Sequence, residues 1–220
     1  MWEARRAVPG ARLSHARRAL DIVGATLWRR PRLRTTVALS VVLGLSSFYL
    51  VWLIQPYMQA RGVPEAWFGP IWAGAHLWLA GASLASDRAV AALGARGTLL
   101  ACCLLIAAGY GGLAAGESAW SFLFYLCLMT VRGLQGPILL QFLQREAPAG
   151  DRASVLSLNA MLFRAAFVMT GPLVGVVVER LGMAAALAVL GAALTVLALA
   201  ALGAFARAHP SGAAPPASPA

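Results

Sequence analysis

Long apolar runs alternate with short polar separators along most of the chain. Runs of about 17 to 25 mostly apolar residues have the length of a helix that crosses a bilayer. Six such runs occur, with approximate limits 36–57, 67–85, 98–115, 119–142, 154–178 and 183–206. Lipid offers no partner for backbone N–H and C=O groups, so each run is expected to be helical. The pattern predicts an all-α membrane protein with six transmembrane helices.

Composition strengthens this prediction and limits the chemistry. The chain is 60% hydrophobic and only 12% charged, whereas about a quarter of the residues of an ordinary soluble domain are charged. Its three cysteines, Cys102, Cys103 and Cys127, lie inside apolar runs and lack the spacing of zinc ligands. We therefore predict no metal site, cofactor or catalytic residue.

The arginines indicate an orientation. All 18 basic residues are arginine, and nine of them lie within the first 34 residues. With the N-terminus inside, fourteen arginines fall on inner segments, and only Arg61 and Arg180 fall on outer loops. Cytoplasmic segments of membrane proteins carry such an excess, so we predict a multi-pass protein of the cell membrane with both termini cytoplasmic. The net charge of +10 is then a membrane-anchoring feature and does not indicate nucleic-acid binding.

The same pattern divides the chain into three parts. Residues 1–34 form a basic cytoplasmic leader, in which Leu13, Ala16, Leu20, Val23 and Leu27 repeat at helical spacing. This spacing predicts an amphipathic helix on the inner membrane surface. Residues 35–207 form the six-helix bundle, and residues 208–220, rich in Pro, Ala and Ser, are expected to be a disordered cytoplasmic tail.

Polar side chains are distributed unevenly among the six spans. The first, second, fourth and fifth carry strongly polar residues, including Gln55, His76, Arg132 and Arg164, while the third and sixth are almost uniformly apolar. A similar sequence, an acid and an arginine followed by Leu-Gly, comes after the second span (87–94) and after the fifth (179–182). The two copies are three spans apart and so lie on opposite sides of the membrane. This favours two inverted three-helix repeats, as in many secondary transporters.

Two stretches resemble the C-terminal six-helix half of a major facilitator superfamily transporter, and the resemblance covers roughly residues 15 to 207. GASLASDRAVAALGARG resembles the loop motif of the second half, with Asp87, Arg88, Gly94 and Arg96 at matching places and Ala95 where a second basic residue is common. DRASVLSLNAMLFRAAFVMTGPLVGVVVERLG resembles the eleventh span of the family with its flanking loops. The resemblance implies that the first, second, fourth and fifth helices line a cavity, and that the leader corresponds to the loop joining the two halves. It also implies alternating access, in which bundles rock around a central site.

Arg132 and Arg164 are the candidate cavity residues, together with Gln135 and His76. Both arginines lie near mid-depth in their spans, where an unpartnered guanidinium costs roughly 3 to more than 10 kcal/mol. They should therefore face protein or water. No acid lies within the spans, so the partner is either a carboxylate of a second half or an anionic group of the solute. His76 is either a proton relay or a packed neutral histidine.

The remaining candidates concern conformation. Asp87, Arg88 and Arg96 are expected to form salt bridges at the inner face. The pairs Gly136-Pro137 and Gly171-Pro172 interrupt backbone hydrogen bonding in the two arginine-bearing helices, as either hinges or fixed kinks. Gly175 follows Gly171 by four residues, a spacing that permits close helix approach.

The sequence therefore predicts secondary transport of a small solute, with protons as a candidate coupling ion and no enzymatic activity. Six helices form one half of such a carrier, so a second half is expected: a separate chain, a missing N-terminal half or a second copy. The alternatives are a non-transporting membrane assembly or regulatory protein, and an intramembrane enzyme. The enzyme is disfavoured because no Gly-x-Ser-Gly motif accompanies a base at membrane depth.

Overall fold

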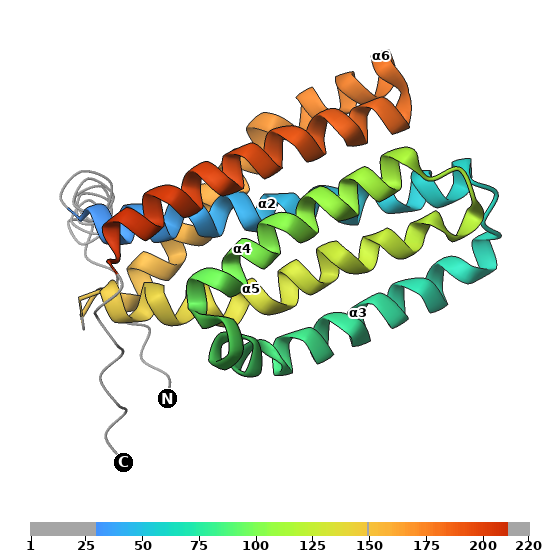
Figure 1. Cartoon of the computed structure of the whole chain (residues 1–220). Coiled ribbons are helices and arrows are strands. Elements are labelled where there is room, and N and C mark those ends of the chain that lie inside the picture. The colour runs from blue at the N-terminus through green and yellow to red at the C-terminus, as the bar shows by residue number, and fades with distance from the viewer. Residues whose placement is uncertain (1–29, 149, 211–220) are drawn as a thin grey trace, which may run out of the picture.

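A computed structural model describes residues 30–148 and 150–210, and in this part of the chain the regular secondary structure is all helical, without strands. Its longer helices run roughly side by side (Figure 1). The elements are α2 (Pro31–Ala60), η2 (Glu65–Trp67), α3 (Phe68–Leu84), α4 (Ser86–Ala115), η3 (Ala119–Phe124), α5 (Tyr125–Glu146) and α6 (Arg152–Ala208). The predicted leader helix and most of the predicted tail lie outside the described residues.

Four helical segments of the described chain are long and apolar enough to cross a membrane. They are α2, α4, η3 with α5, and α6. This confirms the prediction of an all-helical chain with membrane-length apolar helices. The first, third and fourth predicted spans correspond to α2, to α4, and to η3 with α5. The fifth and sixth both lie within α6, and the second corresponds to α3, which has 17 residues.

Helix α6 has 57 residues but is not one straight rod, because Gly182 interrupts it with φ 79° and ψ 164°. L-residues with a side chain rarely adopt this backbone conformation. We call residues 152–181 the first arm of α6 and residues 183–208 the second arm. Figure 1 shows the two arms lying side by side, the first in orange and the second in red, joined at the end labelled α6.

Gly94 in α4 has nearly the same backbone conformation, with φ 71° and ψ 163°. It separates a short helical stretch, residues 86–93, from the long rod of residues 95–115. The Leu-Gly pairs found in the sequence thus share a second property. Each glycine reverses or redirects the chain immediately before an almost uniformly apolar helix.

Most of the closely packed helix pairs are not consecutive in the chain, although α4 and α5, which are joined through η3, also pack closely. Helix α3 packs mainly on α5, and α6 packs on α2 and α4. Trp78 of α3 donates from Nε1 to the hydroxyl of Thr130 in α5 over 2.8 Å. In the first arm of α6, the Asn159 amide donates to the Ser40 hydroxyl of α2 over 3.2 Å. The second arm meets α4 so closely that a Cβ at Gly191 would lie 2.3 Å from Cβ of Tyr110.

The described arginines gather at one end of the bundle. The arginine-rich end is the end where α2 begins and where α5 and α6 finish. Its described arginines are Arg30, Arg32, Arg34, Arg88, Arg96, Arg145, Arg152 and Arg207. The opposite end carries Arg61 and Arg180. The two ends thus differ in arginine content, which is the asymmetry from which the orientation is predicted.

Candidate functional site

Arg132 lies within α5, 14 residues before the end of that helix, or about 21 Å along the axis. Its side chain is half-buried, and the guanidinium carbon lies 6.0 Å from the ring centroid of Phe48 in α2. Gln135, one turn further along α5, is buried. Arg132 therefore lies on the side of α5 that approaches α2, and Gln135, three residues further on, shares a helix face with it.

Arg164 lies 12 residues into α6, about 18 Å along its axis, and its side chain is exposed. Within residues 30–148 and 150–210 its guanidinium has no hydrogen-bond or ion-pair partner. The exposed residues Ser157, Met161, Val168 and Gly175 lie along the same helical stripe. We call these five residues the open stripe. On this stripe, Arg164 lies near the middle of the first arm and has no partner in the rest of the described chain.

Four aromatic side chains of α2 and the first arm of α6, which were not predicted as a group, form a cluster next to Arg132. Phe48 packs edge-to-face on Phe163 and Phe167, with ring centroids 5.2 and 4.8 Å away. Trp52 stacks on Phe167 with a centroid separation of 6.4 Å and an angle of 25°. Arg132 contacts the Phe48 side of this cluster, while Arg164 adjoins Phe163 in the chain and shares a helix face with Phe167. We call these four rings the aromatic cluster.

A local signal for the aromatic cluster was present in the sequence. Phe48 and Trp52 are four residues apart, as are Phe163 and Phe167, and such pairs share one face of a helix. Both pairs lie at mid-span. Their pairing with each other depends on how α2 meets α6, which no local pattern specifies.

His76 lies apart from the two arginines. Its Nδ1 donates to the Trp72 carbonyl oxygen over 2.9 Å, and its ring packs on that of Trp72. The side chain is exposed on α3, and no contact in the described chain joins it to either arginine. The structure therefore does not bring all four candidate cavity residues together.

The predicted Gly-Pro positions do not interrupt their helices, and no other helix of the described chain contacts their glycines. The helices continue through Pro137 and Pro172 without interruption. A Cβ at Gly136 or Gly175 would meet no atom within 4 Å, and one at Gly171 would meet only Phe167 of the same helix, at 3.9 Å. Hence no other helix of the described chain approaches α5 or the first arm of α6 at these glycines.

The arginine-rich end carries a polar cluster that the sequence analysis did not identify. Glu146, at the end of α5, forms a close ion pair with His209, whose Nδ1 donates to the Phe205 carbonyl oxygen over 2.9 Å. The Thr36 hydroxyl lies 3.0 Å from the other carboxylate oxygen of Glu146. Arg30 reaches the backbone oxygen of Glu146 over 3.5 Å. We call Arg30, Thr36, Glu146 and His209 the terminal cluster; it joins α2, α5 and α6. His209, assigned to the tail from sequence, is thus packed at the end of α6.

The predicted salt-bridge residues lie at the same end. Asp87 and Arg88 are exposed. Arg96 donates from Nη2 to the Ala206 carbonyl oxygen over 3.2 Å, which joins α4 to the second arm of α6. The expected salt bridges among these residues stay a prediction.

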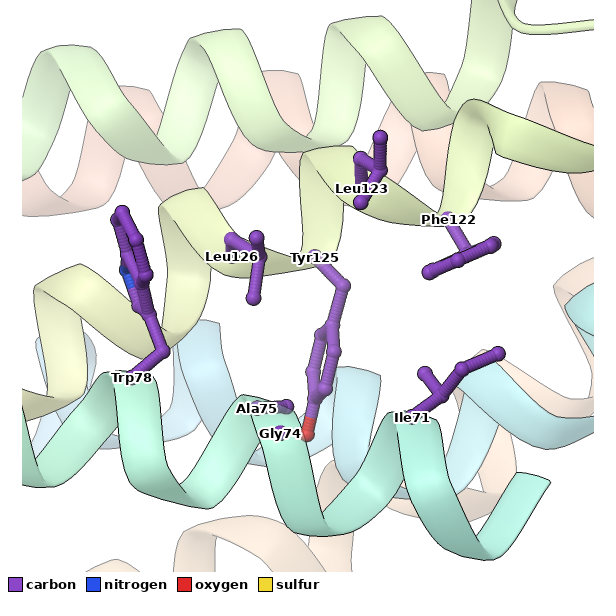
Figure 2. Close-up of a pocket in the computed structure, with 8 residues that line it drawn as sticks. All are labelled: Ile71, Gly74, Ala75, Trp78, Phe122, Leu123, Tyr125 and Leu126. Atoms are coloured by element: carbon purple, nitrogen blue, oxygen red, sulfur yellow. The ribbon is translucent and has the colours of Figure 1, made fainter. Parts of the chain in front are cut away.

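A separate cavity of about 270 Å³ lies between α3 and the segment formed by η3 and the start of α5. Its lining is almost wholly apolar, and Figure 2 shows the Tyr125 side chain extending from α5 toward Gly74 and Ala75. The buried Tyr125 hydroxyl has no hydrogen-bond partner in the described chain. None of the predicted cavity residues lines this space.

No protein-family model, curated protein or solved structure matches this chain.

Proposed function

We propose that this chain is one six-helix half of a facilitator-type secondary carrier, which moves a small solute across the cell membrane by alternating access. The observation that carries the proposal is the placement of Arg132 beside the aromatic cluster and of Arg164 on the open stripe, both well inside apolar helices and without a carboxylate partner from the described chain. Charges at membrane depth occur where they face water, substrate or another protein group. A carrier's central cavity provides such surroundings.

The packing supports two inverted three-helix repeats. In this scheme, α2, α3 and α4 correspond to α5, the first arm of α6 and the second arm. The second helix of each repeat packs on the first helix of the other, since α3 packs on α5 and the first arm packs on α2. The third helices, α4 and the second arm, pack on each other. Gly94 and Gly182 have matching backbone conformations at equivalent places, as two copies of one ancestral unit would.

The open stripe supports the requirement for a second half. It presents an unpartnered cation and a glycine against which no helix of the described chain packs. A stripe of this kind is poorly suited to lipid, because a guanidinium at this depth needs a polar partner. It is suited to the wall of an aqueous vestibule that a second six-helix unit closes. By the positive-inside rule, the arginine-rich end is cytoplasmic.

Accessibility of engineered cysteines tests the proposal. Val168 on the open stripe and Val196 on the second arm are both valines of α6 and are similarly exposed, at 69% and 65%. We expect Val168→Cys to react with a membrane-impermeant thiol reagent in both right-side-out and inside-out vesicles, because an alternating cavity opens to each side. Val196→Cys should stay unlabelled, because it faces lipid. The native cysteines are buried or half-buried, so the parent chain supplies the background.

The result that overturns the proposal is equal protection of the two cysteines in both vesicle orientations. Labelling of Val168→Cys from one side only would also contradict alternating access, since it would describe a static vestibule.

A further inference from the structure

We infer that the solute is an organic anion with a flat aromatic body, which binds between Arg132, Arg164 and the aromatic cluster. The inference rests on the proposed function, since it specifies the chemistry of the transported solute. It follows from three properties of this region: its charge, the nature of its walls and the exposure of its groups.

The charge of the region is positive and is not neutralised locally. The described acids are all at or near helix ends: Glu65, Asp87, Glu117, Glu146, Asp151 and Glu179. Arg132 and Arg164 are therefore the ionised groups at mid-depth in the described helices. A cationic solute would add to an existing repulsion. An anion would supply the missing counter-charge, and a carboxylate matches the planar guanidinium fork.

The walls next to these cations are aromatic. Phe48 lies under the Arg132 guanidinium at 6.0 Å, and Trp52 stacks on Phe167 while remaining 63% exposed. The indole thus has surface free to contact a further flat group. Aromatic pairs contribute about 0.5–1.5 kcal/mol beyond the area that they bury, so these walls favour a planar apolar body over an aliphatic one.

The remaining groups of the region are exposed in the described chain and are therefore accessible to a ligand. Arg164 and Met161 are exposed on the open stripe, where a guanidinium can turn toward a bound carboxylate. Met161 is flexible and polarisable and adapts to ligands of different outline. By contrast, the Arg61 guanidinium lies 5.5 Å from the ring centroid of Tyr57, at the C-terminal end of α2. This arginine–aromatic pair lies outside the proposed binding region, so Arg61 serves as a matched control for substitutions of Arg132 and Arg164.

Equilibrium binding of 2-naphthoate to the full chain in lipid nanodiscs tests the inference. The same aromatic body is available as neutral 2-naphthamide and as cationic 2-naphthylmethylamine, and acetate supplies the charge without the ring. We expect specific binding of radiolabelled 2-naphthoate that the amide, the amine and acetate fail to displace at the same concentration. Arg132→Gln and Arg164→Gln should each weaken binding about 10- to 100-fold, the loss expected for a charge-assisted hydrogen bond. Arg61→Gln should leave it unchanged.

Each outcome is decisive. Displacement by the amide as effective as by unlabelled naphthoate, or a similar loss in Arg61→Gln, would overturn the inference, as would absence of saturable binding. Thermal unfolding of each variant identifies any that fails to fold. For such a position, Lys in place of Gln retains the charge and should retain part of the affinity. The two proposals can fail separately. Two-sided labelling of Val168→Cys without naphthoate binding would support the carrier and exclude this solute class. Specific naphthoate binding without labelling of Val168→Cys would support an anion site and exclude the carrier.

Discussion

The two arms of α6 both contain a long apolar run, but they differ in how their charged groups and glycines contact the rest of the described chain. The second arm packs on α4 through Gly191 and accepts hydrogen bonds at its end from Arg96 and Arg32, at Ala206 and Ala208. His209, just beyond it, pairs with Glu146. The first arm carries a cation at mid-depth without a partner in the described chain, and its glycines have no helix against them.

This difference shows what hydropathy alone leaves undetermined. Each arm contains an apolar run of about membrane-spanning length in the sequence, yet only the first carries a charge in the middle of that run without a partner in the described chain. An unpaired charge within a membrane span is unfavourable unless another group binds to it. An unpaired charge next to glycines that no helix contacts therefore indicates a surface where another group binds. Under the proposed function, the first arm is where a solute and a second half would meet the chain, whereas substitutions in the second arm are expected to affect mainly the stability of the fold.

The largest expected effect comes from filling the two glycine positions with the same side chain. A Cβ at Gly191 would lie 2.3 Å from Cβ of Tyr110, whereas one at Gly175 would meet nothing within 4 Å. We expect Gly191→Leu to separate α4 from the second arm and to lower the free energy of unfolding by about 3 kcal/mol or more. Gly175→Leu should raise it by up to about 1 kcal/mol, because leucine is a better helix former than glycine.

Thermal unfolding of the detergent-purified chain, followed by loss of the monodisperse species, measures both changes. If Gly175→Leu were as destabilising as Gly191→Leu, another helix would pack against Gly175 in the purified protein. The proposed difference between the two arms would then be wrong.

A smaller effect is expected at the terminal cluster. Replacing Glu146 with Ala removes the ion pair with His209 and the contact with the Thr36 hydroxyl. Unmaking half-buried polar contacts of this kind costs about 1–3 kcal/mol, so the melting temperature should fall. Glu179→Ala removes an exposed carboxylate of the first arm and should change stability by less than about 0.5 kcal/mol. Equal melting temperatures for the two variants would mean that the terminal cluster does not hold the three helix ends together.

Much of the fold could be predicted from the sequence because it depends on local patterns. The apolar runs specify helices of membrane length, and Leu93-Gly94 and Leu181-Gly182 mark places where the helical backbone breaks. The boundaries were less accurate, because helices continue beyond the apolar part. Helix α2 begins at Pro31, and α5 continues to Glu146, each several residues beyond the predicted span.

The site was predictable only in part, for a different physical reason. A cation in an apolar run is conspicuous, so the sequence alone is enough to choose Arg132 and Arg164 as candidates. The aromatic cluster and the terminal cluster depend on residues more than 60 positions apart, such as Phe48 with Phe167 and Glu146 with His209. Phenylalanine in a membrane helix is unremarkable until its neighbour is known, and a histidine followed by Pro-Ser-Gly looks like the start of a tail.

The smallest expected effect on stability is the most informative about function. Arg96→Leu removes a bond from α4 to the Ala206 carbonyl oxygen and should lower the free energy of unfolding by about 0.5–1.5 kcal/mol. Arg164→Leu removes a mid-depth charge that has no partner in the described chain, so stability should stay within about 0.5 kcal/mol of the parent or rise. Denaturant or thermal unfolding of both variants in the same detergent makes the comparison. A clear loss for Arg164→Leu would show that the guanidinium is already paired within the folded chain, and a residue already paired would have no free charge to offer a solute.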